Sequence, residues 1–414
     1  MAQPPADRDG GRRSLQVLHG VRVIDVTMFA FVPVAGGILS HWGADVIKVE
    51  DPKACDPMRL LSGGTIEPGG SYMSFKNYNR GKRAVAIDLA TDDGRSILYR
   101  LVETADVFLT SYLPATRRKL GIDVDDIRSH NRRIVYAKGS GHGPRGPESE
   151  RRAYDAATWW ARGSLADSAM AVSGADAPTG MVGHGDTISG TVLAGGICAA
   201  LLQRERTGVA PVVDGSLLGT AIWYNHQPIV ASKLGFRWGG RPAAREEQVP
   251  TLTSYRTRDG RFISLVFVND PDEDWADLCR HLGRPDLATE PRFATASARS
   301  ANRAEAVRLL DGVFAERTLA EWKERLSTAR GVWAAVQTPG EIHDDPQTIA
   351  NGFIRQVTYP TGTIALPVPP VLFDEEGGDI EAAPDYCQHT DEVLEEAGYT
   401  AEDIARYRKA GVIA

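Results

Sequence analysis

Strand-like and helix-like segments alternate along the first 140 residues, and this alternation limits the possible folds more than any other feature of the sequence. The segments with strand character are Val21–Val26, Ala44–Glu50, Arg83–Leu89, Asp106–Thr110 and Arg133–Lys138. A helix-like segment follows the first strand, and Thr91 can cap another helix after the third. Strand–helix–strand repeats place their strands in a parallel sheet with helices over its faces. We therefore predict an α/β fold with a Rossmann-like open parallel sheet.

The glycine pattern of dinucleotide-binding proteins does not follow the first predicted strand, so a nicotinamide cofactor is not indicated. The segment GHGPRG at Gly141–Gly146 matches GxGxxG by letter and follows a strand. Pro144 and the charged residues after it do not begin a helix, however, and we interpret this segment as a loop.

The character of the sequence changes along the chain and suggests where its domains begin and end. Residues 1–18 are predicted to form a disordered tail, and a large domain is expected at 19–225. A strand–turn–strand pattern around Asp259-Gly260 and the helices after it predict a smaller α+β domain at 226–335. Residues 336–414 form a C-terminal segment that returns to strand and loop character.

The composition excludes several classes of function. A net charge of −7 without a long basic run argues against a nucleic acid partner. The four cysteines form no CxxC pair, which is typical of free thiols in the reducing cytoplasm. The nine histidines form no HxH or HxxxH pair, so no metal site is predicted. No apolar run reaches the ~18 residues of a membrane span, and no membrane partner is expected.

Asp186 lies in the glycine-rich segment GHGDTISG, with Gly183 and Gly185 before it and Gly190 after it. Glycine lets the backbone approach a ligand closely. The small apolar residues after Gly190 predict a buried helix, so Asp186 is expected in a loop that leads into a core helix. There a carboxylate can act as a nucleophile that forms acyl-enzyme intermediates. It can also simply cap the helix, and residue type alone favours this capping role.

Several motifs follow one another in a fixed order. They are GVRVIDVT near the start, GADVIKVE, NYNRGKRAVAIDL, the Tyr154-Asp155 pair, Gly185-Asp186, RERTGVAPVVDGSLL and HTDEVLEEAGY near the end. In this order and spacing the sequence resembles the family III CoA-transferases, the carnitine/bile-acid CoA-transferase family that includes formyl-CoA transferase and the α-methylacyl-CoA racemases. The resemblance covers nearly the whole chain.

The resemblance implies a large Rossmann-like domain, a small domain, a C-terminal segment that returns to the large domain, and an interlocked homodimer. It also implies that Asp186 is the catalytic carboxylate, which reverses the preference for capping. Such an enzyme moves CoA between an acyl-CoA thioester and a free carboxylic acid through an aspartyl-acyl anhydride and an aspartyl-CoA thioester. CoA is then a substrate, no tightly bound cofactor is expected, and the expected location is the cytoplasm.

Supporting residues follow from the same resemblance. The backbones of Gly185, Gly239 and Gly240 are candidates to donate N–H groups to an oxyanion. The candidates for binding CoA, mostly cations suited to its phosphates, are Lys53, Lys82, Arg83, Tyr112, Lys119 and Arg152. Tyr112 stands in the segment Ser111–Ala115, where relatives often have Asn-Phe-Arg-Pro-Gly.

Two alternatives to CoA transfer stay open at this point. Racemases of the family carry a His-Asp pair where this chain has Tyr154-Asp155, and a Glu at about Asn269. Racemisation needs a base on each face of the α-carbon, and a tyrosine with a pKa of about 10 is a poor proton acceptor. We therefore favour transfer, with Asp155 orienting substrate or capping its helix. A non-catalytic acyl-CoA-binding protein is the second alternative, and the retention of Asp186 speaks against it.

The sequence does not identify the donor and acceptor acids. Ala30-Phe31-Val32-Pro33 stands where formyl-CoA transferase has Gln-Ala-Gly-Pro. The bulkier Phe31 and Val32 argue against formyl and oxalyl substrates.

Overall fold

The structure is a computed structural model of the chain, and it describes residues 15–178, 180–236, 238 and 244–414. These residues form two compact units, each described here by itself. The larger unit takes its described residues from 15–170, 175–238 and 346–414, and the smaller unit from 171–174 and 244–345. Both main divisions come later in the chain than the predicted domain boundaries at 225/226 and 335/336.

The predicted tail at residues 1–18 is only partly within the described residues, because 1–14 lie outside them. The prediction of disorder is wrong for the rest of this segment. Leu15 and Leu18 pack against a core cluster of the larger unit. The amide of Leu18 also donates to the carbonyl of Trp42 at 2.8 Å. Two leucines that can be buried are enough to hold these residues on the surface of the fold.

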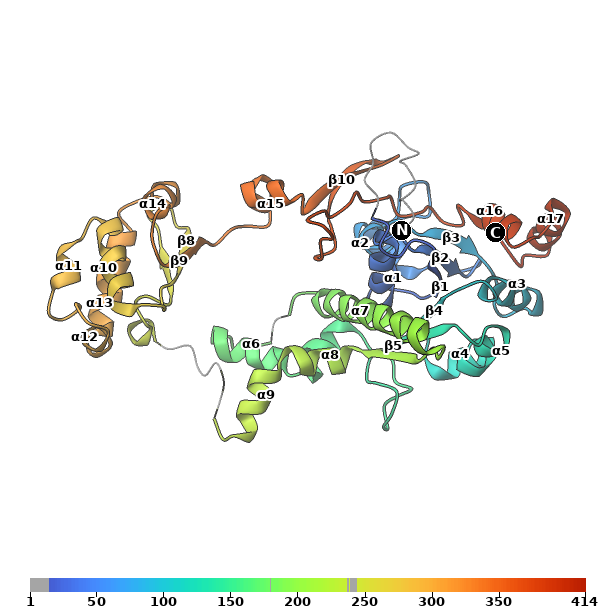
Figure 1. Cartoon of the computed structure of the whole chain (residues 1–414), viewed down its shortest axis with the longest axis horizontal. Coiled ribbons are helices and arrows are strands. Elements are labelled where there is room, and N and C mark those ends of the chain that lie inside the picture. Colours follow the sequence, from blue (N-terminus) through green and yellow to red (C-terminus); the bar gives the residue numbers. More distant parts are fainter. Residues whose placement is uncertain (1–14, 179, 237, 239–243) are drawn as a thin grey trace. The chain divides into compact units, whose positions relative to one another are not determined.

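A six-stranded parallel sheet is the centre of the larger unit, as described, and confirms the predicted α/β class (Figure 1). Its strands are β1 (Arg22–Val26), β2 (Asp45–Glu50), β3 (Arg83–Ala86), β4 (Val107–Thr110), β5 (Val135–Ser140) and β6 (Val212–Ser216). Their order is β3-β2-β1-β4-β5-β6, the arrangement of a Rossmann sheet. The sequence did not indicate β6, which is short and only half-buried.

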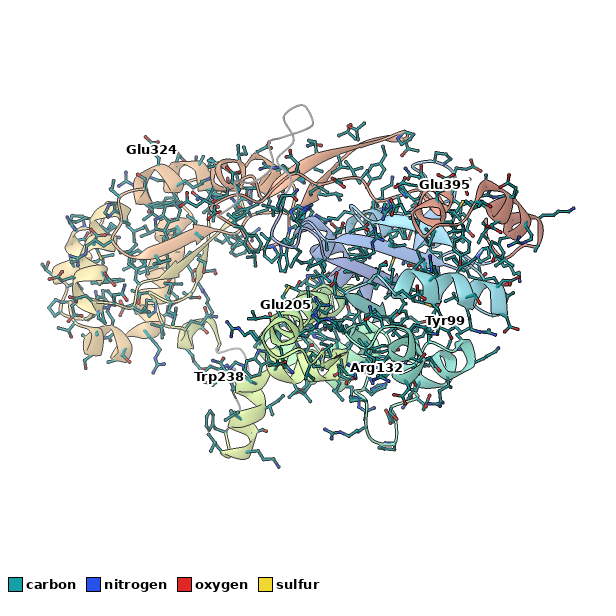
Figure 2. The ribbon with its side chains drawn as sticks, turned by 45° about the vertical axis from the view of Figure 1, so that its right-hand side comes forward. Tyr99, Arg132, Glu205, Trp238, Glu324 and Glu395 are labelled. Atoms are coloured by element: carbon teal, nitrogen blue, oxygen red, sulfur yellow. The ribbon has the colours of Figure 1, made fainter. Side chains whose placement is uncertain are left out.

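Helices cover both faces of this sheet. Those that begin in the larger unit are α1 (Phe31–His41), α2 (Met73–Tyr78), α3 (Asp92–Val102), α4 (Pro114–Leu120), α5 (Val124–His130), α6 (Leu165–Ser173), α7 (His184–Thr207), α8 (Leu217–Tyr224), α9 (His226–Lys233), α15 (Pro346–Asn351), α16 (Thr390–Glu396) and α17 (Ala401–Lys409). One face packs against α1 and α7, and the other against α3, α5, α16 and α17. In Figure 2, Tyr99 marks α3, Glu395 marks α16 and Glu205 marks the last turns of α7.

The long helix α7 packs closely against α1. A Cβ atom on Gly190 would lie 2.5 Å from the carbonyl oxygen of Phe31, so this contact requires glycine. By length and composition, α7 could cross a membrane. Nearly half of its most apolar window is buried, however, and Leu193, Ala194 and Ile197 belong to the core under the sheet. We therefore interpret α7 as the core helix of the larger unit.

The last residues of the chain close one edge of the same sheet. Ile413 forms a bridge with Ile87, just after the edge strand β3. The amide of Asp88 donates to the carbonyl of Val412 at 2.8 Å, and the amide of Ala84 donates to His389 Nδ1 at 3.2 Å. The hairpin of β10 (Ile354–Tyr359) and β11 (Gly362–Pro367) precedes this segment.

The smaller unit has its own core. Its strands β7 (Ser254–Arg256), β8 (Phe262–Val266) and β9 (Val332–Ala335) form an antiparallel sheet. Its helices are α10 (Pro271–Leu282), α11 (Asp286–Thr289), α12 (Ala296–Ala301), α13 (Arg303–Phe314) and α14 (Leu319–Leu326). The indoles of Trp275 and Trp322 are fully buried in this core. The turn predicted at Asp259-Gly260 joins β7 to β8, with Gly260 at a φ of 77°.

Candidate active site

The strand order reverses between β1 and β4, and the carboxyl ends of these strands carry the loops that lead into α1 and α4. A crevice at such a position is where parallel α/β sheets bind ligands. The amide of Met28, after β1, donates to Ser111 Oγ, after β4, at 3.0 Å and joins the two loops. Phe29 has a left-handed φ of 65°, a conformation that is unusual for a bulky residue.

Asp186 is the third residue of α7, which begins at His184. The prediction that Asp186 lies in a loop before a helix starting after Gly190 is therefore wrong. The cap of α7 comes from a distant residue. Asp155 accepts hydrogen bonds from the amide of Gly183 at 2.7 Å and from the amide of Gly185 at 3.1 Å. Asp155 thus caps the helix that carries Asp186, and not the π-helix Ala156–Arg162 that follows it in sequence.

Gly185 is required by this arrangement. A Cβ atom at position 185 would lie 2.3 Å from Asp155 Oδ1 and 2.3 Å from Cγ of Trp159. The indole of Trp159 is buried in the core beneath the start of α7. The Gly185-Asp186 pair therefore combines a position that must lack a side chain with a position whose side chain carries a charge.

The Asp186 carboxylate is partly enclosed. None of the described residues donates a hydrogen bond to it, so the capping role that residue type favoured is filled by Asp155 instead. Burial, and then the negative charge of Asp155, raise the pKa of Asp186 to about 7. Residues four apart share one face of a helix. Asp186 therefore lies one turn before Gly190, on the face through which Gly190 contacts the start of α1.

The first turn of α1 offers free donors at this place. No side chain caps α1. Among the described residues, none accepts a hydrogen bond from the amide of Phe31 or Val32, although both residues are buried. The predicted donor Gly185 has its N–H bonded to Asp155 and is not available. Gly239 and Gly240 lie outside the described residues.

Two tyrosines lie near the start of α7. Tyr154, with 61% of its surface exposed, packs its ring edge-on to Phe29 at 5.7 Å. Burial raises the pKa of Tyr78, and the nearby carboxylates of Asp186 and Asp155 raise it further. Sequence reasoning missed Tyr78. Its position inside the motif NYNRGKRAVAIDL was the available signal, but nothing local indicated that the side chain faces α7.

A cavity lies on the Thr187 side of α7. It is lined mainly by apolar groups of α1, α2, α7 and the end of β11 with the residues after it, including Val34, Ile38, Tyr78, Thr187 and Pro367. A mostly apolar hollow beside a desolvated carboxylate can hold the carbon chain of an organic acid.

The candidates for binding CoA are placed in two different environments. Lys53 and Arg152 are exposed on the loops that follow β2 and β5 at the carboxyl edge of the sheet, and Lys119 is exposed in the last turn of α4, which follows β4. Tyr112 is half-buried directly after β4. Lys53 also pairs with Asp88 at 2.5 Å.

The side chains of Lys82 and Arg83 are both held by other groups of the protein. The ammonium of Lys82 is fully buried, and three protein oxygens accept its hydrogen bonds. Arg83 begins β3 at the amino edge of the sheet, where Asp45 and two glutamates of α16 bind its guanidinium. The sequence presented both as candidates for binding CoA, and it did not show these counter-ions because they come from distant parts of the chain. Within the described residues, no group of three or more His, Cys, Asp or Glu side chains is placed to hold a metal ion.

Comparisons with known proteins identify relatives of the whole chain. The model of CoA-transferase family III matches residues 18–390. The (R)-2-hydroxy-4-methylpentanoate CoA-transferase of Clostridioides difficile is 30% identical over 96% of this chain and 99% of its own length. A probable fatty acyl-CoA transferase of Mycobacterium tuberculosis is 33% identical over 84% of this chain and 90% of its own. The crystal structure of a CAIB/BAIF family protein from Brucella suis matches with a TM-score of 0.78 at 26% identity, over 92% of this chain and 99% of that one.

Proposed function

Because the chain belongs to CoA-transferase family III, we propose that it transfers CoA from an acyl-CoA thioester to a free carboxylic acid through covalent intermediates on Asp186. The observation that carries this proposal is the state of the Asp186 carboxylate. It lies at the start of a core helix, receives no hydrogen bond from the described residues and has a pKa raised to about 7 by burial. A carboxylate that is poorly solvated and not used for capping is a better nucleophile than an ordinary surface aspartate.

The first half of the reaction moves CoA onto the enzyme. A carboxylate oxygen of Asp186 attacks the thioester carbonyl, the carbon–sulfur bond breaks, and CoA leaves as a thiolate. The product is an anhydride between the donor acid and Asp186. The thiolate then attacks Cγ of Asp186 and releases the donor carboxylate. An aspartyl-CoA thioester results, with no net change in protons.

The second half repeats these steps in reverse. The acceptor carboxylate attacks Cγ of Asp186, and CoA thiolate leaves while a second anhydride forms. The thiolate attacks the acyl carbon of the acceptor and frees the Asp186 carboxylate. Each tetrahedral intermediate carries an oxyanion that N–H donors stabilise. The unbonded amides of Phe31 and Val32, at the start of the helix that faces Asp186, are the donors we assign to this task.

The proposal includes CoA contacts at the carboxyl edge of the sheet. Lys53, Tyr112, Lys119 and Arg152 are retained as its candidates. Lys53, Tyr112 and Arg152 lie on loops after β2, β4 and β5, and Lys119 is exposed in the last turn of α4. Cationic side chains suit the phosphates of CoA. Lys82 and Arg83 are withdrawn from this set, because the Lys82 ammonium is fully buried against Asp25 and Arg83 pairs with carboxylates at the amino edge of the sheet.

We extend the proposal to an interlocked homodimer in which the smaller unit is a separate domain. The support within the chain is apolar surface on α8, α9 and the residues after them. Trp223 is 78% exposed and Leu234 is 69% exposed. Large apolar side chains gathered on neighbouring helices are typical of a surface that a partner covers.

The proposed function is tested by mixing the protein with a panel of acyl-CoA thioesters and free acids and measuring the new thioesters by mass spectrometry. Transfer is expected for the wild type and not for Asp186→Asn. Hydroxylamine added during turnover should mark Asp186 as a hydroxamate, which peptide mapping detects. Absence of CoA exchange with every pair would contradict the proposal.

The same experiment separates the alternatives. In D₂O, a racemase would place deuterium at the α-carbon of the acyl group without a second acid. A non-catalytic acyl-CoA-binding protein would protect the thioester and show neither exchange nor hydroxamate. The phenol at Tyr154 and the amide at Asn269 supply no second base, so we expect no deuterium at the α-carbon.

A further inference from the structure

A buried ion pair lies directly beneath the first turns of α1. The Lys82 ammonium is 2.7 Å from Asp25 Oδ2, and both side chains have no exposed surface. Lys82 also donates to the carbonyl of Pro33 and to Asn79 Oδ1, each at 2.9 Å. A Cβ atom on Gly36 would lie 2.5 Å from Asp25 Oδ2, so α1 rests on the pair itself.

A second buried ion pair continues from the first. Asp25 and Lys48 are register partners on β1 and β2. The Lys48 ammonium is 2.9 Å from Asp56 Oδ2 and donates to the carbonyl of Thr27 at 3.0 Å. Asp56 Oδ1 accepts the amide of the left-handed Phe29 at 3.0 Å. The Thr27 hydroxyl donates to Asp25 Oδ1, so that Thr27 links the second ion pair to the first.

These charges hold one short loop by its backbone. The loop between β1 and α1 is bound at the carbonyl of Thr27 and the amide of Phe29, and the first turn of α1 is bound at the carbonyl of Pro33; each partner is a buried charged side chain. The same loop leads into α1, which packs on α7 at Gly190, one turn after Asp186, and the ring of Phe29 packs on Tyr154, the neighbour of the capping residue Asp155.

We propose that the buried charges of Asp25, Lys82, Lys48 and Asp56 are positioning residues that fix the β1–α1 loop against Asp186. The proposal rests on the proposed function for its kinetic part, because the loop leads directly into the first turn of α1, whose Phe31 and Val32 amides are the oxyanion donors assigned above. Charged hydrogen bonds from opposite sides allow the loop little movement. A displacement of about 1 Å in a reacting group can cost about 100-fold in rate.

A gain in folding stability does not explain why the fold contains the ion pair of Lys82 and Asp25. Burial lowers the pKa of Lys82 to about 8, and the opposing attraction of Asp25 does not restore the usual value. Lys48 also faces this ammonium and lowers its pKa, while Asp56 raises it. The folded-state pKa is therefore below the unfolded value, and below about pH 8 the charge on Lys82 costs folding free energy. Neutral replacements of buried ion pairs are often tolerated by the fold, so the charges can be removed to test the loop.

The test uses the double variant Asp25→Asn with Lys82→Met, which removes both charges at similar volume. We expect kcat to fall about 30-fold while KM for acyl-CoA stays within about threefold, because positioning acts on the transition state. The matched control is Asp106→Asn with Arg204→Met. That pair, 2.9 Å apart, joins β4 to the far end of α7 and touches no part of the loop. The control should change the melting temperature without lowering kcat by more than about twofold.

Hydrogen exchange followed by mass spectrometry supplies a readout independent of activity. The peptide covering residues 27–34 should exchange faster in Asp25→Asn/Lys82→Met, whereas the peptide covering 184–192 should not change. Unchanged exchange at 27–34, or a kcat within threefold of wild type, would overturn the positioning role. If the wild type transfers no CoA at all, the proposed function fails by itself, and the exchange data still decide the inference.

A milder variant covers the case in which the double variant does not fold. Thr27→Val keeps the shape of the side chain and removes only the hydroxyl that bonds Asp25. We expect a fivefold to tenfold loss in kcat, about the worth of one hydrogen bond in the connection, together with faster exchange at 27–34. No change in either measurement would also overturn the inference.

Discussion

Lys82 and Arg83 are neighbours in the chain, but their side chains belong to ion clusters of opposite kind. The Lys82 ammonium is enclosed under α1 with Asp25, and burial lowers its pKa to about 8. The Arg83 guanidinium lies at the amino edge of the sheet and pairs with Asp45 and Glu396. Burial opposes the charge of Arg83 too, but hydrogen bonds with Glu396 and Asp45 outweigh it and raise the pKa.

The contrast between these clusters separates charges that serve the reaction from charges that stabilise the fold. Around Asp186 and the loop before α1, the fold holds two charges, on Asp186 and Lys82, that burial disfavours. At the amino edge, the fold holds a charge that its partners favour. Active sites commonly contain groups that reduce stability. Variants in the two clusters should therefore change activity and stability separately, and the following predictions are arranged by the size of the expected effect.

The largest effect is expected for Asp186→Asn. Loss of the nucleophile should lower CoA transfer by at least about 10⁴-fold. The folded-state pKa of about 7 lies above the ordinary value of 3.8, so the ionised carboxylate costs folding free energy that is fully present above pH 7 and absent below about pH 4. At pH 8 the amide should therefore raise the melting temperature, by roughly 3 °C. A lower melting temperature would show that the carboxylate is not disfavoured.

Gly185→Ala should have the next largest effect. The new methyl group would meet Asp155 and Trp159 at 2.3 Å, so the start of α7 must move and carry Asp186 with it. We expect kcat to fall about 100-fold. The control is Gly312→Ala in α13, where a Cβ atom meets nothing within 4 Å. That change should leave transfer unaltered and slightly favour the helix. Equal losses in both variants would remove the special role of Gly185.

Asp155→Asn should change how the transfer rate depends on pH. The transfer rate of the wild type should fall as the pH drops through about 7, because Asp186 must be ionised to attack. Asp155 contributes to the raised pKa of Asp186 by like charge. The amide removes that repulsion, so the acid limb of the kcat/KM profile should move to lower pH. The plateau should fall about tenfold, since one amide of the α7 cap loses its acceptor. An acid limb at unchanged or higher pH would contradict this account.

Arg83→Gln should have the smallest effect on catalysis. We expect KM for acyl-CoA and kcat to stay within about twofold, because the guanidinium faces Asp45 and Glu396 and not the site. Stability should fall by about 1–2 kcal/mol, measured by urea unfolding. Lys53→Gln is the matched variant at the carboxyl edge, and there a raised KM for acyl-CoA is expected. A raised KM in Arg83→Gln would restore Arg83 as a CoA contact.

The sequence predicted those parts of the molecule that depend on neighbouring residues. The first five strands, the helix capped by Thr91 and the turn at Asp259-Gly260 are all found close to their predicted places. Each is encoded by an apolar pattern or a turn residue within a short window. The half-buried strand β6 has no such pattern and was missed.

The errors in the site share one physical cause, which is distance along the chain. Asp155 caps α7 from 28 residues before Gly183, and the pair of Lys82 and Asp25 spans 57 residues. The bond from Arg83 to Glu396 spans 313. A single sequence shows that these residues are charged, but it does not show which opposite charge the fold brings to them. For this reason Asp186 was identified through its family motif, while its capping partner and the buried cluster beneath α1 came only from the structure.

The bridge between Ile87 and Ile413 has a consequence for how the protein is made. The edge strand β3 acquires its cover from residues far later in the chain, whereas the smaller unit is synthesised before them and can complete its core earlier. Until those residues are synthesised, the backbone beside Ile87 is open to pairing with strands of other nascent chains. Removal of the segment around Ile413 would make that exposure permanent.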